Sequence, residues 1–308
     1  MIVYSKFNIN RKPRFQIETR ISRDSKKLSS IKKAHTTDSV DFLNSFYDKY
    51  NNLVKNNFSF TPIKPQKVSG VEIAFEYQKE PTLEHLLFSS LTNNKIEKYV
   101  ALIKEYVELV KMNSIDHVYV NSRFKKIFGH QGTSIKMECM RLGCIDINFD
   151  NVIVCENKQF KLIDYEWTFS DTPVPYKYVV FRALISFYHS FSSYNLNQYY
   201  PIKTLFKDMG ISLAEQKQFI YFEYNFQSYV QNNSFINNTK LHDYFSFLKH
   251  TLKQDLPKDK PLQNRKDIIE RDQKIEILSA EIEKIKSSNT YKIWQKYCQL
   301  RDKFFKLE

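Results

Sequence analysis

Residues 144–167 read CIDINFDNVIVCENKQFKLIDYEW, and the interpretation of the whole chain starts from this stretch. It predicts a short loop, a buried strand that begins at Asn151, a polar turn at residues 156–158 and a second strand over residues 160–163. The two strands are close enough in sequence to form a hairpin. A hairpin holds the polar side chains at the ends of its strands at fixed separation, so this stretch is the place to look for a site.

Asp146, Asn151 and Asp164 are oxygen-bearing side chains around this hairpin. Asn151 follows Asp146 by five residues, and Asp164 follows Asn151 by thirteen. Phosphoryl transfer needs one carboxylate that accepts the proton of an attacking hydroxyl, and an amide oxygen with a second carboxylate to hold Mg²⁺ on the phosphates. We therefore predict Asp146 as catalytic, and Asn151 and Asp164 as metal ligands. Alternatively, Asp146 and Asp150 are turn residues and Asp164 caps a strand.

The five-residue spacing is also that of the D-x-x-x-x-N catalytic loop of protein kinases. The following I-D-x-E motif resembles the aminoglycoside and choline kinase-like branch of that fold. A longer pattern is I-D-I-N-F-D-N-V-I-V, then L-I-D-Y-E-W, then P-V-P-x-x-Y-V-V-F-R-A-L. It is similar to the kinase domains of bacterial O-antigen chain-terminating kinase/methyltransferases. The similarity covers most of residues 15–250, and it implies an α+β, two-lobed protein kinase-like fold that uses ATP and Mg²⁺.

The resemblance also implies which residues contact the nucleotide. Lys32 ends a strand that reads S-S-I-K, where kinases have V-A-I-K, and Lys33 is the alternative because the register is uncertain by one residue. Asp48, on the helix that follows, is the predicted acidic partner of this lysine. Glu76 and Tyr77 end a buried strand, where backbone groups would meet the adenine. Without the resemblance, the two lysines are equally well explained as solvated residues of a basic edge strand.

Two features depart from the kinase pattern. The chain has only 5 glycines and none precedes Gly70, so the G-x-G-x-x-G phosphate loop is absent. Cys144 stands two residues before Asp146, where kinases and their relatives often carry a His that braces the loop. A kinase-fold scaffold without turnover, which organises glycosyltransferases at the membrane, is therefore the alternative from another class. The intact Asp-Asn-Asp set favours an enzyme.

The composition indicates a largely globular chain. Of 308 residues, 42% are hydrophobic and 15% are aromatic, which is enough to bury a sizeable core. We divide the chain into residues 1–78, an N-lobe of strands with one helix, residues 79–255, a helical C-lobe with the catalytic loop, and residues 256–308, a linker and tail. Arg182 lies within an apolar helical pattern and needs a partner if it is buried, for which we predict Glu166.

The tail predicts a coiled coil followed by an amphipathic helix. Ile268, Ile275 and Ile282 repeat every seven residues, which favours a homo-oligomer. The last stretch interleaves aromatic and basic residues. Such helices lie on anionic membrane surfaces, dock on protein partners, here a glycosyltransferase or methyltransferase, or bind single-stranded nucleic acid. The net charge of +13 favours a polyanionic partner, but no nucleic-acid-binding motif is present, so we expect no nucleic acid.

These observations predict an ATP- and Mg²⁺-dependent phosphotransferase. No apolar run reaches about 18 residues and the N-terminus lacks the apolar core of a signal peptide. We therefore expect a cytoplasmic protein that is peripheral on the inner face of the cell membrane. The acceptor is implied by the resemblance alone: a sugar hydroxyl of a lipid-linked surface polysaccharide such as O-antigen or capsule. A small amino alcohol or a heptose is the alternative acceptor.

Overall fold

The computed structural model describes the following parts of the chain: residues 2–24, 27–119, 121–129, 136–232 and 243–248. The chain divides into two compact units, Met1–Pro257 and Lys258–Glu308, and all described residues belong to the first unit. The predicted coiled coil and basic aromatic helix therefore lie outside the described residues. The division of the remainder at residue 78 stays a prediction.

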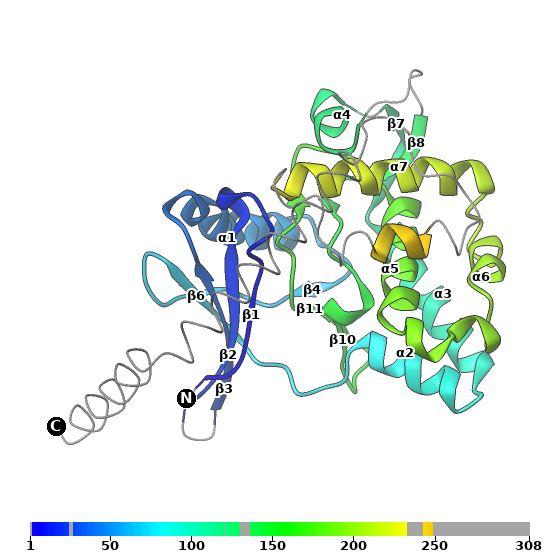
Figure 1. Ribbon diagram of the computed structural model, residues 1–308, viewed down its shortest axis with the longest axis horizontal. Helices are drawn as coiled ribbons and strands as arrows, with labels where there is room; N and C mark the ends of the chain where they lie inside the picture. The colour runs from blue at the N-terminus through cyan, green and yellow to red at the C-terminus, as the bar shows by residue number, and fades with distance from the viewer. Residues whose placement is uncertain (1, 25–26, 120, 130–135, 233–242, 249–308) are drawn as a thin grey trace, which may run out of the picture. The chain divides into compact units, whose positions relative to one another are not determined.

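A five-stranded antiparallel sheet forms the N-terminal part (Figure 1). Its order is β1-β2-β3-β6-β5, with the strands β1 Ile2–Phe7, β2 Ile17–Asp24, β3 Lys27–Ala34, β6 Glu72–Glu76 and β5 Gln66–Lys67. Neighbouring residues of a strand point to opposite faces. Lys32 is therefore buried, whereas Lys33 lies on the outer face and pairs with Glu72 at 3.4 Å. The sequence analysis missed β1, because its side chains are mostly exposed and show no buried alternation.

Helix α1 (Val40–Lys55) follows β3 and contacts the sheet. A capping box between Thr36 and Ser39 starts the helical segment. Leu43, Phe46 and Leu53 are buried on one side of α1, so the helix is held by its apolar stripe.

Helices make up most of the part that follows residue 82 (Figure 1). They are α2 Leu83–Thr92, α3 Ile96–Met112, α4 Ser122–Phe128, α5 Tyr176–Ser190, α6 Ile202–Asp208 and α7 Leu213–Val230, and residues 243–248 are also helical. α5 is buried on nearly all sides, which explains its apolar composition, and it contacts both α3 and α7. In the described ranges, no helix combines the length and apolar character needed to cross a bilayer.

The predicted hairpin forms next to the sheet-bearing part. β10 (Val152–Val154) pairs antiparallel with β11 (Phe160–Leu162), and β11 pairs in parallel with β4 (Thr61–Pro62). Asn151 itself belongs to a 3₁₀ turn, so the first strand begins one residue later than predicted. The expected α+β class is confirmed: a sheet with a lysine on β3 and a helix after it is followed by a mainly helical part that carries the predicted hairpin.

The remaining elements are short. The strands are β7 Ser114–Tyr119, β8 Lys136–Met140, β9 Gly143–Cys144, β12 Thr168–Phe169 and β13 Val174–Pro175. The 3₁₀ helices are η1 Pro13–Phe15, η2 Thr37–Ser39, η3 Phe149–Asn151, η4 Ser192–Tyr194 and η5 Leu196–Gln198. The pairing of β9 with β12 holds the start of the catalytic loop against the segment that follows the hairpin.

Arg182 of α5 is buried, and its partner differs from the predicted one. Its Nε donates to Glu223 of α7 at 3.1 Å, and its Nη1 donates to the carbonyl oxygen of Ile145 at 2.8 Å. The prediction that Arg182 pairs with Glu166 is wrong, because α7 supplies a closer carboxylate. The Arg182–Glu223 pair thus connects two helices with the backbone just before Asp146.

Removing this arginine should destabilise the fold strongly. We expect Arg182→Met to lower the free energy of unfolding by about 3–5 kcal/mol, because the carboxylate of Glu223 stays buried without its cation. Urea denaturation followed by circular dichroism measures this change. Lys177→Met on the same helix removes a more exposed pair with Glu215, which should cost less than about 1 kcal/mol. Equal losses in the two variants would contradict the assignment.

Candidate active site

A cavity of about 460 Å³ lies between the sheet and the hairpin. Its walls come from β2, β3, β6, the segment after β6 and the two ends of the hairpin. Lys32, Glu76, Tyr77, Asn151 and Asp164 all line it. The structure thus brings together every residue predicted to bind nucleotide or metal except Asp48, although they come from distant parts of the chain.

An ion pair between Lys32 and Asp164 crosses the inner end of this cavity. Lys32 Nζ donates to Asp164 Oδ2 at 2.7 Å, and Asp164 Oδ1 accepts the backbone N–H of Glu166 at 3.3 Å. Lys32 is only 3% exposed. Burial disfavours its charged form, but the negative charges of Asp164 and Glu166 outweigh burial and raise the pKa of Lys32. Lys32 therefore stays positively charged where it lines the cavity.

Asp146 and Asn151 are connected through the catalytic loop. Asn151 Nδ2 donates to the carbonyl oxygen of Asp146 at 2.9 Å, so the amide oxygen of Asn151 is the atom left to coordinate a metal. Asp146 is 5% exposed and does not line the cavity. Its Oδ2 accepts the backbone N–H of Trp167 at 2.6 Å. The side chain of Asp146 is thus held by the backbone of the segment that follows the hairpin.

The surroundings of Asp146 make its carboxyl group more basic than usual. Burial, followed by the negative charges of Glu166 and Asp164, raises the pKa of Asp146 well above its ordinary range. Arg182 acts in the opposite direction, with its Nη1 at 4.0 Å from Asp146 Oδ1. The Asp146 carboxyl group therefore holds a proton more tightly than an exposed aspartate does.

Glu166 is a buried carboxylate to which the sequence analysis gave only a bracing role. Its Oε1 accepts from Arg11 at 2.5 Å, its Oε2 lies 3.8 Å from Lys32 Nζ, and its backbone carbonyl accepts from Lys49 Nζ at 2.5 Å. Burial opposes ionisation, but Arg11 and Lys32 prevail and lower the pKa of Glu166 to about 2. The acids that meet Lys32 therefore come from the D-Y-E motif after the hairpin.

Asp48 does not contact Lys32, so the predicted pair between them is not formed. Asp48 is exposed on α1 and lines a second cavity, whereas its neighbour Lys49 turns inward. Phe42, Phe46 and Lys49 follow one another at helical spacing, and this stripe was a signal that could have identified Lys49. Nothing in the sequence signals Arg11, which reaches Glu166 from the N-terminal segment.

Asn151 and Asp164 fit a magnesium site. Both offer a side-chain oxygen and both line the cavity. Mg²⁺ usually takes one or two protein oxygens and completes its coordination with phosphate oxygens and water. The described ranges contain no group of three His, Cys, Asp or Glu side chains that could hold a metal, so a site here depends on the nucleotide for further ligands.

Comparisons with known proteins give similarity to solved structures. No family model and no curated protein matches the sequence. The choline kinase LicA from Streptococcus pneumoniae shares 11% identity with a TM-score of 0.38, covering 81% of this chain and 94% of that chain. LicA in complex with AMP gives 12% identity and a TM-score of 0.36, covering 76% and 88%. An ethanolamine kinase from Plasmodium vivax shares 9% identity with a TM-score of 0.30, and the match covers 82% of this chain and 78% of that chain. At these sequence identities and TM-scores, activity has to be inferred from the geometry of the site.

Neutralising Glu166 should destabilise the chain, because Arg11 and Lys32 would lose a buried countercharge. We expect Glu166→Gln to lower the free energy of unfolding by about 3 kcal/mol, as measured by urea denaturation. Glu76→Gln is the matched control, since Glu76 is exposed at the rim of the same cavity, and it should change stability by less than about 0.5 kcal/mol. A loss no larger than that of the control would show that Glu166 does not hold the cluster together.

Proposed function

We propose that this chain is an ATP- and Mg²⁺-dependent phosphotransferase with an alcohol group as acceptor. The observation that carries the proposal is that Lys32, Asn151 and Asp164 line one cavity. The backbone carbonyl of Asp146 accepts a hydrogen bond from the side chain of Asn151. Lys32 and Asp164 are in contact although 132 positions separate them in the sequence. A cation, an amide oxygen and two carboxylates in this arrangement are the groups that phosphoryl transfer uses.

Each residue then has a defined part in the reaction. Asn151 and Asp164 would hold Mg²⁺, which neutralises charge on the phosphates when it is bound. Lys32 would contact the phosphates as a point charge. Asp146 would orient the acceptor hydroxyl and take its proton at Oδ1, because Oδ2 accepts from Trp167. Catalysis would come mainly from positioning and charge neutralisation.

The segment after β6 is the proposed adenine site. Glu76 and Tyr77 line the cavity where this segment leaves the sheet. Phe75, Ile153 and Ile163 add apolar side chains to the same lining, which suits a flat base. Backbone groups of Glu76 and Tyr77 would provide the hydrogen bonds that orient it.

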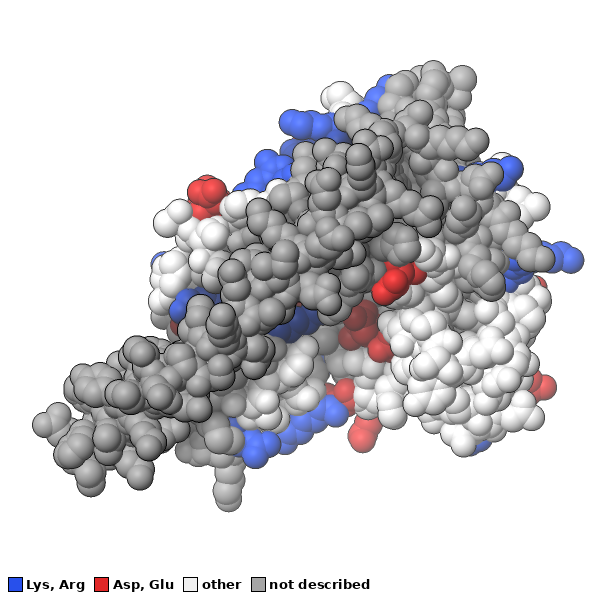
Figure 2. Space-filling model, in the orientation of Figure 1, with Lys and Arg blue, Asp and Glu red and all other residues white. Residues whose placement is uncertain are grey.

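Among alcohol acceptors, the lining favours a small amino alcohol. Asp150 lines the cavity, and burial together with the charge of Asp150 raises the pKa of nearby Glu84 to about 7. Within the described ranges, neither acid forms an ion pair, so a cationic group on the acceptor would stabilise both. Acidic side chains also gather near the middle of the face drawn in Figure 2. A sugar hydroxyl on a lipid-linked polysaccharide, suggested by the sequence motifs, is the second candidate.

Nucleotide binding tests the proposal first. Thermal-shift titration of the full chain with ATP should give a stabilisation that requires Mg²⁺ and disappears in Asp164→Asn. Asp146→Asn should keep this stabilisation but lower kcat by about 10²–10⁴-fold, because only the general base is lost. Asp41→Asn, an exposed change on α1, is the control for both measurements. No stabilisation at millimolar ATP would instead support a scaffold without turnover.

The acceptor class can be tested by a coupled assay of ADP release. We expect ethanolamine or choline to be phosphorylated faster than glycerol or a neutral hexose. Asp150→Asn should then raise KM for the amino alcohol about tenfold, because one charged contact is lost, while its effect on glycerol is small. Faster turnover of a neutral sugar, unaffected by Asp150→Asn, would favour the sugar acceptor.

A further inference from the structure

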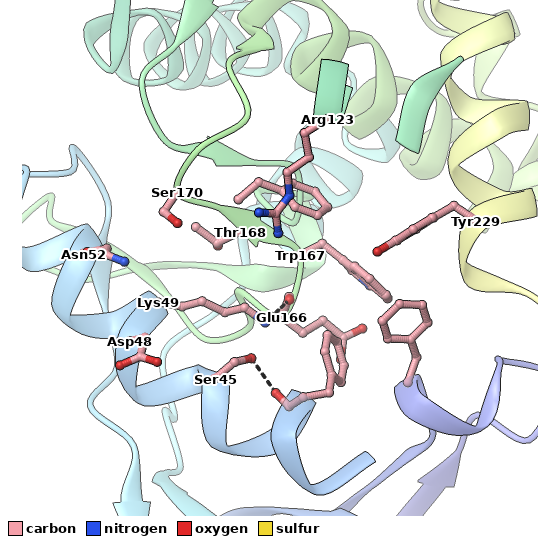
Figure 3. A pocket seen from close by; sticks show the side chains of 13 residues that line it. Ser45, Asp48, Lys49, Asn52, Arg123, Glu166, Trp167, Thr168, Ser170 and Tyr229 are labelled. Carbon is pink, nitrogen blue, oxygen red and sulfur yellow. Dashed lines mark hydrogen bonds between the residues drawn. The ribbon is translucent and has the colours of Figure 1, made fainter. Parts of the chain in front are cut away.

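A second cavity, of about 310 Å³, lies between α1 and the segment 166–170 that follows the hairpin. Figure 3 shows its lining from close by. The walls come from η1, α1, α4, α7 and this segment. Of the residues predicted from the sequence to form the active site, Asp48 alone lines it. The two cavities therefore share no lining residue.

One wall of this cavity is aromatic. The ring of Trp167 packs edge-on against Phe15 at 4.9 Å and tilted against Phe42 at 5.1 Å, and Phe15 also contacts Tyr229 at 5.5 Å. Rings that hold one another in this way form a rigid apolar surface. Such a wall suits the carbon skeleton of a small ligand.

Lys49 brings a positive charge to the floor of the cavity. Its Nζ donates to the carbonyl oxygen of Glu166 and lies 4.4 Å from the centre of the Phe42 ring. In the part of the chain that the structure describes, no carboxylate is in ion-pair contact with Lys49. Burial lowers the pKa of Lys49 to about 8, and nearby acids offset this only in part. An ammonium group has three N–H donors, so Lys49 can bind an anion with those that remain.

Arg123 of α4 enters the same cavity from the opposite side (Figure 3). It pairs with Asp171, but its side chain is 56% exposed and its guanidinium carries further N–H donors. Tyr229 directs its hydroxyl group toward the cavity from α7 (Figure 3). Arg123 and Tyr229 also line an adjoining hollow together with Arg14 and Lys126. The mouth of the cavity is thus basic.

We propose that this cavity is a second binding site, which takes an organic phosphate monoester. The apolar body of the ligand would lie against Trp167, and its phosphate would lie between Lys49 and Arg123. Arginine forms paired hydrogen bonds with phosphate and lysine adds a point charge, so together they match a dianion. Among the acids nearby, Glu166 is already paired with Arg11 and Asp48 is exposed, whereas Asp171 pairs with Arg123 and would compete with the phosphate for it.

Occupancy of this cavity would act on the first cavity through Glu166. A phosphate that draws Lys49 away releases the carbonyl oxygen of Glu166, whose carboxylate contacts Lys32, and Lys32 in turn contacts Asp164. The site would thus regulate nucleotide binding. This regulatory role rests on the proposed phosphotransferase function, whereas the binding of the phosphate monoester does not.

Trp167 is a natural reporter for this binding. The chain has two tryptophans, so Trp294→Phe leaves Trp167 as the single fluorophore of this kind. Phenyl phosphate, titrated at constant ionic strength without nucleotide or Mg²⁺, should change the emission of Trp167 in a saturable way. Lys49→Met should weaken binding about tenfold or more, because one charged hydrogen bond is lost. Lys104→Met, an exposed lysine on α3, should leave the affinity unchanged.

A second pair of variants tests the site without touching a buried residue. Asp171→Asn frees Arg123 from its carboxylate and should tighten binding of phenyl phosphate severalfold, whereas Arg123→Gln should weaken it. No saturable signal up to about 10 mM, or equal affinities in the parent, Lys49→Met and Asp171→Asn, would overturn the proposal. Neither ATP binding nor turnover is read in these titrations. The second site and the phosphotransferase function can therefore fail independently.

Discussion

The contact between Lys32 and Asp164 is the interaction on which the rest of the site depends. It joins β3 to the end of the hairpin, and the lysine is almost fully buried. A buried ammonium group is stable only when it is paired, so the sheet and the hairpin cannot separate without a large electrostatic cost. Glu166 extends this contact into a cluster, because it binds Arg11 and lies close to Lys32. The position of the first cavity follows from this cluster.

The catalytic loop is held from its other side by α5 and α7. Arg182 donates to the carbonyl oxygen of Ile145 and is itself fixed by Glu223. Asp146 is thereby kept between a cation and two acids, and the acids together with burial make its carboxyl group more basic. The same packing that stabilises the fold thus raises the pKa of the Asp146 carboxyl group. Cys144, two residues before Asp146, is buried and pairs through its backbone with Thr168.

Glu166 also links the two cavities. Its carboxylate belongs to the cluster beside the first cavity, and its backbone carbonyl binds Lys49 at the floor of the second. One residue thus contacts both Lys49 and Lys32.

Local patterns in the sequence predicted much of the fold, and the oxygen-bearing residues of the site were found because they flank a hairpin whose strands are buried. Periodicity is encoded within a few residues, so α1, α3, β3 and β6 were predictable. The partners of charged residues were not. Arg182 pairs with Glu223, whereas Glu166 was predicted as its partner. On α1, Lys49 points inward, whereas Asp48 was predicted to do so. These partners are 41 positions apart for Arg182 and Glu223 and 117 positions apart for Lys49 and Glu166, and which charges meet depends on how the whole chain packs.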